Sequence, residues 1–190
     1  RHDLLNHLGL ISYLAKEGQM KKLDNYLSHY RQKIGESLVS VDTGAAQLDA
    51  LFSLKLSQAR EKDISVKLEI ASAIKCSPQY SLDLVSIIGN AFDNTIEACE
   101  ELPETDRFIK VELSENPLEY SFVITNSYHR EKIAVVQEIL QKGGSSKGQV
   151  RGQGLDIMKK LTAKYQGHIN FSPLKDTFTV TIEIPKHQLK

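Results

Sequence analysis

Apolar residues near the start of the chain recur at the spacing of a helix with one buried face. This first stripe consists of Leu4, Leu8, Ile11 and Ala15. Gly18 interrupts the pattern, and a second helical stripe consists of Met20, Leu23, Leu27, Tyr30 and Ile34. The pattern predicts a helical hairpin. Because a hairpin is too small to bury both stripes alone, we expect two copies to pair as a four-helix bundle.

The rest of the chain alternates between helical and strand patterns. We predict helices over 45–62, 78–102, 133–140 and 155–165, and strands over 64–70, 108–114, 120–125, 168–171 and 178–184. Helices on one side of a mixed sheet give an α+β chain with a two-layer α/β sandwich. We therefore divide the chain into a dimerisation hairpin (1–37), a linker (38–43) and a compact domain (44–190).

Composition narrows the classes of function. The 24 basic and 24 acidic residues cancel, so nothing in the total charge favours nucleic acid as a partner. Cys76 and Cys99 do not form a Cys-x-x-Cys pair, which argues against a zinc site or a disulfide framework. No apolar run approaches the roughly 20 residues that span a bilayer. The sequence begins at Arg1, inside a helical pattern, so we expect a further segment upstream.

The predicted helix over 78–102 has two contrasting faces. Its apolar stripe consists of Val85, Ile88, Phe92, Ile96 and Cys99, and its polar side of Asp83, Ser86, Asn90, Asn94, Glu97 and Glu101. A polar side is usually just solvated. Asparagine is a poor helix former, however, so the pair Asn90 and Asn94 in mid-helix is unexpected. Their amide oxygens would suit Mg²⁺ that is also held by substrate phosphates.

A glycine-rich segment precedes the predicted helix over 155–165. Gly152 and Gly154 let a backbone approach a polyphosphate closely, and the helix N-terminus offers free N–H groups. Lys147 and Arg151 add local positive charge. The segment lacks the Walker A pattern. A flexible surface loop is the alternative interpretation, and the two cations favour phosphate binding.

His2 is a candidate nucleophile at the start of the hairpin. With Asn6 it shares a face distinct from the apolar stripe. The adjacent Asp3 would favour the useful tautomer or take the proton. A plain surface histidine is the commoner explanation for any single residue of this type.

Three motifs together resemble the phosphoacceptor, N and G boxes of bacterial sensor histidine kinases. They are Arg-His-Asp-x-x-Asn-His at 1–7, Gly-Asn-x-x-Asp-Asn-x-Ile-Glu-Ala at 89–98, and Ser-Ser-Lys-Gly-x-x-Arg-Gly-x-Gly-Leu at 145–155. They occur in the order of that family. Within that family, the sequence most resembles quorum-sensing peptide receptors of the AgrC and ComD type. This resemblance implies a dimerisation hairpin followed by a Bergerat-type GHKL domain.

The resemblance implies roles for individual residues. His2 would accept the γ-phosphoryl group of ATP, with Asp3 polarising it and Asn6 assisting. Asn90 would ligate Mg²⁺, with Asn94 supporting the nucleotide. The set implied for the lid over the triphosphate is Ser145, Lys147, Arg151, Gly152 and Gly154. Adenine would lie near Asn126.

Two positions differ from the wider superfamily. Residues 126–128 read Asn-Ser-Tyr where Asp-x-Gly-x-Gly is usual. Ser86 occupies the place of the glutamate that activates water in ATP-hydrolysing relatives. A histidine acceptor needs no such glutamate, because the imidazole is itself the nucleophile.

The sequence thus predicts the catalytic core of a homodimeric two-component kinase, which phosphorylates His2 and then a response regulator receiver domain. By the same resemblance, a membrane-anchored sensor region lies upstream, and the kinase core lies on the cytoplasmic side of the membrane. One alternative keeps the fold without kinase activity, as a phosphorelay or scaffold dimer of the sporulation-phosphotransferase type. Another is a GHKL serine kinase for an anti-sigma partner, which the His2 motif disfavours.

Overall fold

The chain consists of two compact units. The computed structural model describes residues 2–34, 41–141 and 153–189. The first unit spans residues 1–37 and the second residues 38–190. Within the described residues, no helix is both long enough and apolar enough to cross a membrane.

The first unit is a pair of helices, α1 (His2–Lys16) and α2 (Met20–Ile34). Gly18 lies between them with a φ of 64°, a conformation that glycine adopts without strain. Leu14 and Leu23 are buried, and His7 and Tyr26 share a hydrogen bond of 2.5 Å. Within this single chain Leu8 of the predicted stripe is exposed, and Leu14, which the stripe did not include, is buried.

The second unit contains a mixed sheet, in which β1 and β2 are parallel and the remaining pairs antiparallel. The described residues contribute five strands in the order β1-β2-β3-β5-β4. They are β1 (Ser65–Ile70), β2 (Phe108–Glu115), β3 (Glu119–Ser127), β4 (His168–Leu174) and β5 (Thr177–Pro185). The predicted α+β class with a mixed sheet is confirmed.

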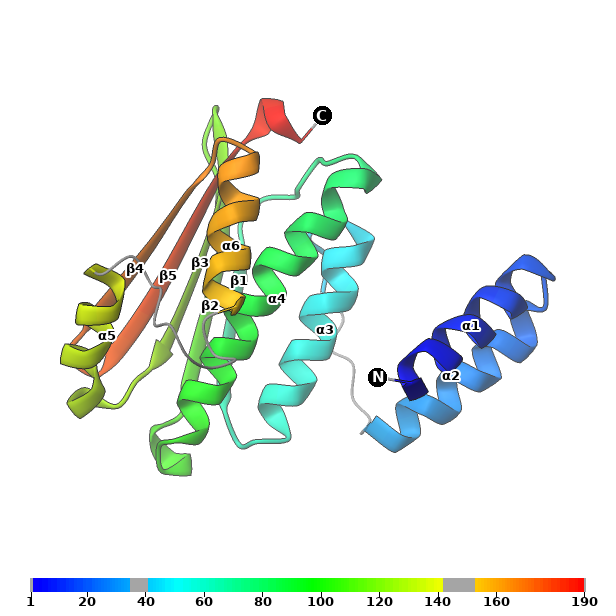
Figure 1. Cartoon of the computed structure of the whole chain (residues 1–190), viewed down its shortest axis with the longest axis horizontal. Helices are drawn as coiled ribbons and strands as arrows, with labels where there is room; N and C mark the ends of the chain where they lie inside the picture. Colours follow the sequence, from blue (N-terminus) through cyan, green and yellow to red (C-terminus); the bar gives the residue numbers. More distant parts are fainter. Residues whose placement is uncertain (1, 35–40, 142–152, 190) are drawn as a thin grey trace. The chain divides into compact units, whose positions relative to one another are not determined.

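Helices α3, α4 and α6 cover one face of this sheet, and α5 lies beside β4 at its edge (Figure 1). Their bounds are α3 (Ala46–Arg60), α4 (Pro78–Glu100), α5 (Ile133–Gln141) and α6 (Gln153–Lys164). Short 3₁₀ helices are η1 (Glu104–Asp106), η2 (Arg130–Lys132) and η4 (Lys186–Gln188).

Helix α4 is the centre of the core. Pro78 stands in its first turn, where a missing N–H costs nothing. Phe92 of α4 meets Phe52 of α3 edge to face, with ring centroids 5.4 Å apart, and both are fully buried. The predicted stripe of α4 is too narrow, because Leu84, Ile87 and Ala91 are also fully buried. Helices on both flanks, as well as the sheet, cover α4.

Two boundaries differ from the prediction in ways that affect the site. Helix α6 begins at Gln153, so Gly154 lies in its first turn and not in the preceding loop. Strand β4 continues past Pro173 to Leu174, since proline is tolerated in an edge strand.

Candidate functional site

Asn90 lies on the flank of α4 that faces α6. Its Nδ2 donates a hydrogen bond of 2.6 Å to the carbonyl oxygen of Ser86, one turn earlier. An amide oxygen is an acceptor with two lone pairs. Since the nitrogen is bound to Ser86, Oδ1 is the atom of Asn90 that can meet a cation or a donor.

Gly154 covers this oxygen from the first turn of α6. A Cβ at Gly154 would lie 3.0 Å from Asn90 Oδ1 and 3.7 Å from Asn94 Oδ1. Two of the predicted motifs therefore meet here. Gly154 is the last glycine of the motif at 145–155, and it lies directly above the two asparagines of the motif at 89–98. The absence of a side chain at Gly154 thus lets the α6 backbone approach these amide oxygens closely.

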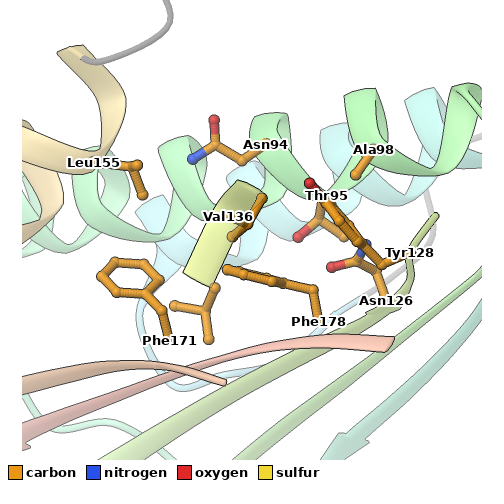
Figure 2. Close-up of a pocket in the computed structure, with 10 residues that line it drawn as sticks. Asn94, Thr95, Ala98, Asn126, Tyr128, Val136, Leu155, Phe171 and Phe178 are labelled. Carbon is orange, nitrogen blue, oxygen red and sulfur yellow. The ribbon is translucent and has the colours of Figure 1, made fainter. Parts of the chain in front are cut away.

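A cavity of about 150 Å³ lies next to this contact, between α4 and the sheet (Figure 2). Its lining consists of Asn94, Thr95, Ala98, Asn126, Tyr128, Val136, Leu155, Phe171, Phe178 and Val180. An apolar cavity of about this volume holds a benzene-sized molecule. The cavity therefore fits a flat heterocycle, with Asn94 at the side nearest Asn90.

Asn126 provides the buried amide of the cavity. It lies near the end of β3, paired with Ile109 on one side and Phe178 on the other, and is 1% exposed. Its Nδ2 donates to the carbonyl oxygen of Ser127 at 2.6 Å. Its Oδ1 is consequently the atom suited to accept from a ligand.

Tyr128 follows two residues later and also lines the cavity. Burial, and then the negative charge of Glu101, raise the pKa of Tyr128 above its ordinary value. Its phenol is therefore neutral at physiological pH, and the wall that it forms carries no charge.

The structure brings together four of the predicted site residues, namely Asn90, Asn94, Asn126 and Gly154. The side chains of His2, Asp3 and Asn6, at the start of α1, lie outside the part that the structure describes. The remaining lid residues, Ser145, Lys147, Arg151 and Gly152, also lie outside the described residues.

Sequence reasoning missed the apolar walls of the cavity. Phe171 and Phe178 alternate with polar residues along β4 and β5, a pattern that core residues share. Thr95 is almost fully buried although it lies in mid-helix. The only signal in the sequence that could have identified Thr95 as part of the site is its position directly after Asn94.

Metal ligands at this site would be neutral oxygens. Among the residues that the structure describes, no group of three or more His, Cys, Asp or Glu could hold a metal ion. Asn90 instead offers one amide oxygen. Such a site suits a hard cation that takes its other ligands from water and phosphate.

Comparison with known proteins gives concordant results. Residues 80–185, more than half of the chain, match a family model described as the GHKL domain. The sensor protein CitS of Bacillus subtilis (strain 168) is 27% identical over 203 residues. That alignment covers 98% of this chain and 35% of CitS, so the chain spans about a third of that relative's length.

Solved structures share the fold at low identity. The catalytic domain of histidine kinase ThkA has a TM-score of 0.61 at 18% identity, over 80% of this chain and 98% of that one. The Acinetobacter baumannii histidine kinase AdeS has a TM-score of 0.54 at 14% identity, over 97% of this chain and 83% of that one. With the family match and the site geometry, these findings lead to one conclusion: the chain belongs to the GHKL domain family.

Proposed function

We propose that the chain is the catalytic core of a two-component sensor histidine kinase that uses Mg·ATP to phosphorylate His2. The main support is the convergence of Asn90, Asn94 and Gly154 beside an apolar cavity that holds Asn126. The family match and the similarity to CitS, a sensor protein, agree with this function.

The adenine ring of ATP would occupy the cavity, between the apolar side chains of β4, β5 and α5. Asn126 Oδ1 would accept a hydrogen bond from the base. The triphosphate would leave the cavity past Asn94 and reach Asn90, where Gly154 allows close approach of the α6 backbone. The free N–H groups in the first turn of α6 favour the negative charge.

Asn90 Oδ1 would hold Mg²⁺ together with the phosphates. The cation supplies neutralisation of the phosphate charge that develops during transfer. We assign Ser145, Lys147, Arg151 and Gly152 to the lid over the triphosphate, with the two cations contacting phosphate oxygens.

In the transfer step, a ring nitrogen of His2 attacks the γ-phosphorus, the bond to the β–γ bridging oxygen breaks, and ADP leaves. Asp3 would fix the tautomer of His2 and take up its ring proton, with Asn6 assisting one turn on. Catalysis here is mainly positioning. The phosphoryl group would then pass to an aspartate of a response regulator receiver domain.

The helical hairpin, which we assign to residues 1–37, would dimerise. Its support is the exposure of Leu8, Tyr13, Met20 and Leu27, whereas Leu14 and Leu23 are the buried apolar residues among residues 7–28, where the structure describes the side chains of this unit. Residues 38–43 would link it to the ATP-binding domain at 44–190. A quorum-sensing receptor type, with a membrane-anchored sensor upstream and this core on the cytoplasmic side of the membrane, remains a proposal from the three motifs.

Calorimetric titration with ATP, with and without Mg²⁺, tests the nucleotide site. We expect binding that strengthens with Mg²⁺, and we expect Asn90→Ala to weaken the Mg²⁺-dependent affinity by about tenfold or more. Asn170→Ala, an exposed asparagine of β4, is the matched control and should bind like the unmodified chain. Absence of nucleotide binding would favour the phosphorelay or scaffold function instead.

A further inference from the structure

The end of α6 far from Gly154 is bonded to α4 at a single carboxylate. Tyr165, which follows α6 directly, donates its hydroxyl hydrogen to Asp83 Oδ2 at 2.5 Å. Lys164 donates from Nζ to the same oxygen at 2.6 Å. Tyr165 is 3% exposed and also meets Tyr80 edge to face, with ring centroids 5.7 Å apart. We call Asp83, Lys164 and Tyr165 the Asp83 clamp.

The two ends of α6 thus meet α4 at different points. The first turn of α6 lies over Asn90 and Asn94, and its last turn lies at Asp83, so the helices run antiparallel side by side (Figure 1). At 1.5 Å per residue, the clamp is about 16 Å along α6 from Gly154. None of the clamp residues lines the cavity. The clamp therefore acts on a ligand there only through α6.

The two hydrogen bonds that Asp83 accepts in the clamp differ in strength. Lys164 is 59% exposed at its side chain, and an ion pair so exposed contributes little. The hydrogen bond from Tyr165 is charge-assisted and its donor is buried, which makes it the stronger one. The directed bond between Asp83 and Tyr165 is thus the main component.

Directed and non-directed contacts have different effects on a packed helix. Helices α4 and α6 pack against each other, and Met158 of α6 is fully buried. Apolar contacts of this kind are non-directional. They hold the helices together without specifying which two atoms must meet. A hydrogen bond between two specified atoms weakens steeply when its geometry changes. The clamp therefore specifies how far α6 slides along α4.

We propose that Asp83 and Tyr165 are positioning residues that set the register of α6 on α4, and so hold Gly154 over Asn90 for the nucleotide's phosphates. This role rests on the proposed function. It predicts that the clamp governs affinity for the triphosphate and not for the base, because Leu155 is the one described residue that α6 contributes to the lining of the cavity, which α4 and the sheet mainly form.

The test compares Mg·ATP with adenosine, which reaches the cavity but not Asn90. We would measure both dissociation constants for the full chain and for Asp83→Ala, Tyr165→Phe and the double variant. Each single variant should weaken Mg·ATP binding by about threefold to tenfold, the value of one hydrogen bond. The double variant should be no weaker than Asp83→Ala, and adenosine affinity should be unchanged throughout. Glu100→Gln, which breaks the ion pair between the last residue of α4 and Lys62, two residues after the end of α3, is the control and should change neither constant.

Equal losses for Mg·ATP and adenosine would show that the clamp only stabilises the fold, and unchanged Mg·ATP binding in the variants would show that it does not set the register. Either result overturns the positioning role while leaving the proposed function intact. Failure of the unmodified chain to bind Mg·ATP would instead contradict the proposed function, and the role of the clamp with it.

Discussion

Asn90 owes its orientation to the backbone one turn before it in α4. Asparagine is disfavoured in helices because its side chain competes for backbone hydrogen bonds, and here Nδ2 binds the carbonyl oxygen of Ser86. The same bond leaves Oδ1 as the acceptor beneath Gly154. A residue that weakens its own helix thereby presents an oriented acceptor oxygen.

Replacing Gly154 with alanine should damage the site and spare the fold. The new Cβ would lie 3.0 Å from Asn90 Oδ1, and the amide would have to move by a few tenths of an ångström from the position in which it faces the ligand. We expect Mg·ATP affinity to fall by about tenfold, with no loss in melting temperature, because alanine favours helices. Calorimetry and thermal unfolding measure the two effects.

Gly89→Ala provides the matched control. Gly89 lies next to Asn90 in α4, but its Cβ would make only an ordinary contact, 3.6 Å from Leu51. This variant should bind Mg·ATP normally. Equal loss of affinity in both variants would contradict the role of the Gly154 contact.

The sequence alone identified the polar part of the site better than the apolar part. Asn90 and Asn94 are conspicuous because asparagine in mid-helix has a physical cost. Phe171 and Phe178 are not, because an apolar residue that lines a cavity follows the same alternation as one in the core. Only the packing of β4 against α5 and α6, and of β5 against α6, separates the two cases.

At the scale of elements, the boundaries could be predicted best where glycine or proline, with their unusual backbone preferences, marks the end of a helix. Gly18 and Pro78 mark helix ends, and α1, α2 and α4 lie within a few residues of their predicted bounds. The strand predicted over 168–171 is longer in the structure, because β4 is an edge strand with a partner on one side only and such a strand tolerates Pro173.

The link between α4 and α6 should depend on pH. The hydrogen bonds from Lys164 and Tyr165 lower the pKa of Asp83 below its ordinary value of 3.8. Stabilisation by this carboxylate is therefore present above that pH and lost as pH falls below it. Burial and the hydrogen bond to Asp83 raise the pKa of Tyr165 above 10.0, so its contribution is lost as pH rises beyond that value.

Thermal unfolding of the unmodified chain and of Tyr165→Phe measures this dependence. The difference in melting temperature should be constant between about pH 5 and about pH 9, and should shrink on both sides of this window. A difference as large at about pH 3 as at about pH 5 would contradict the assignment of Asp83 as the ionised partner.

At the scale of the whole molecule, the two units differ in how completely they bury their apolar residues. The second unit has a continuous core around Phe52, Phe92 and Phe122. In the first unit, Leu8 is 52% exposed and Tyr13 57% exposed. Periodicity predicted these helices, but it could not identify which of their apolar residues face each other within one chain.

Leu8→Glu should therefore weaken self-association of the chain. A charge in place of a leucine at the proposed dimer interface should raise the dimer dissociation constant by about tenfold or more, as measured by analytical ultracentrifugation. Leu118→Glu is the control, since Leu118 is 78% exposed at the turn between β2 and β3. If both variants dimerise as well as the unmodified chain, this face of the hairpin is not the dimer interface.

The most direct test of the proposed kinase is the chemical nature of the phosphate that the chain acquires from γ-labelled ATP with Mg²⁺. A phosphohistidine is labile in acid and stable in alkali, so we predict label of that type, absent from His2→Gln and much reduced in Asn90→Ala. Acid-stable label, or label that survives His2→Gln, would contradict phosphorylation of His2 by this site.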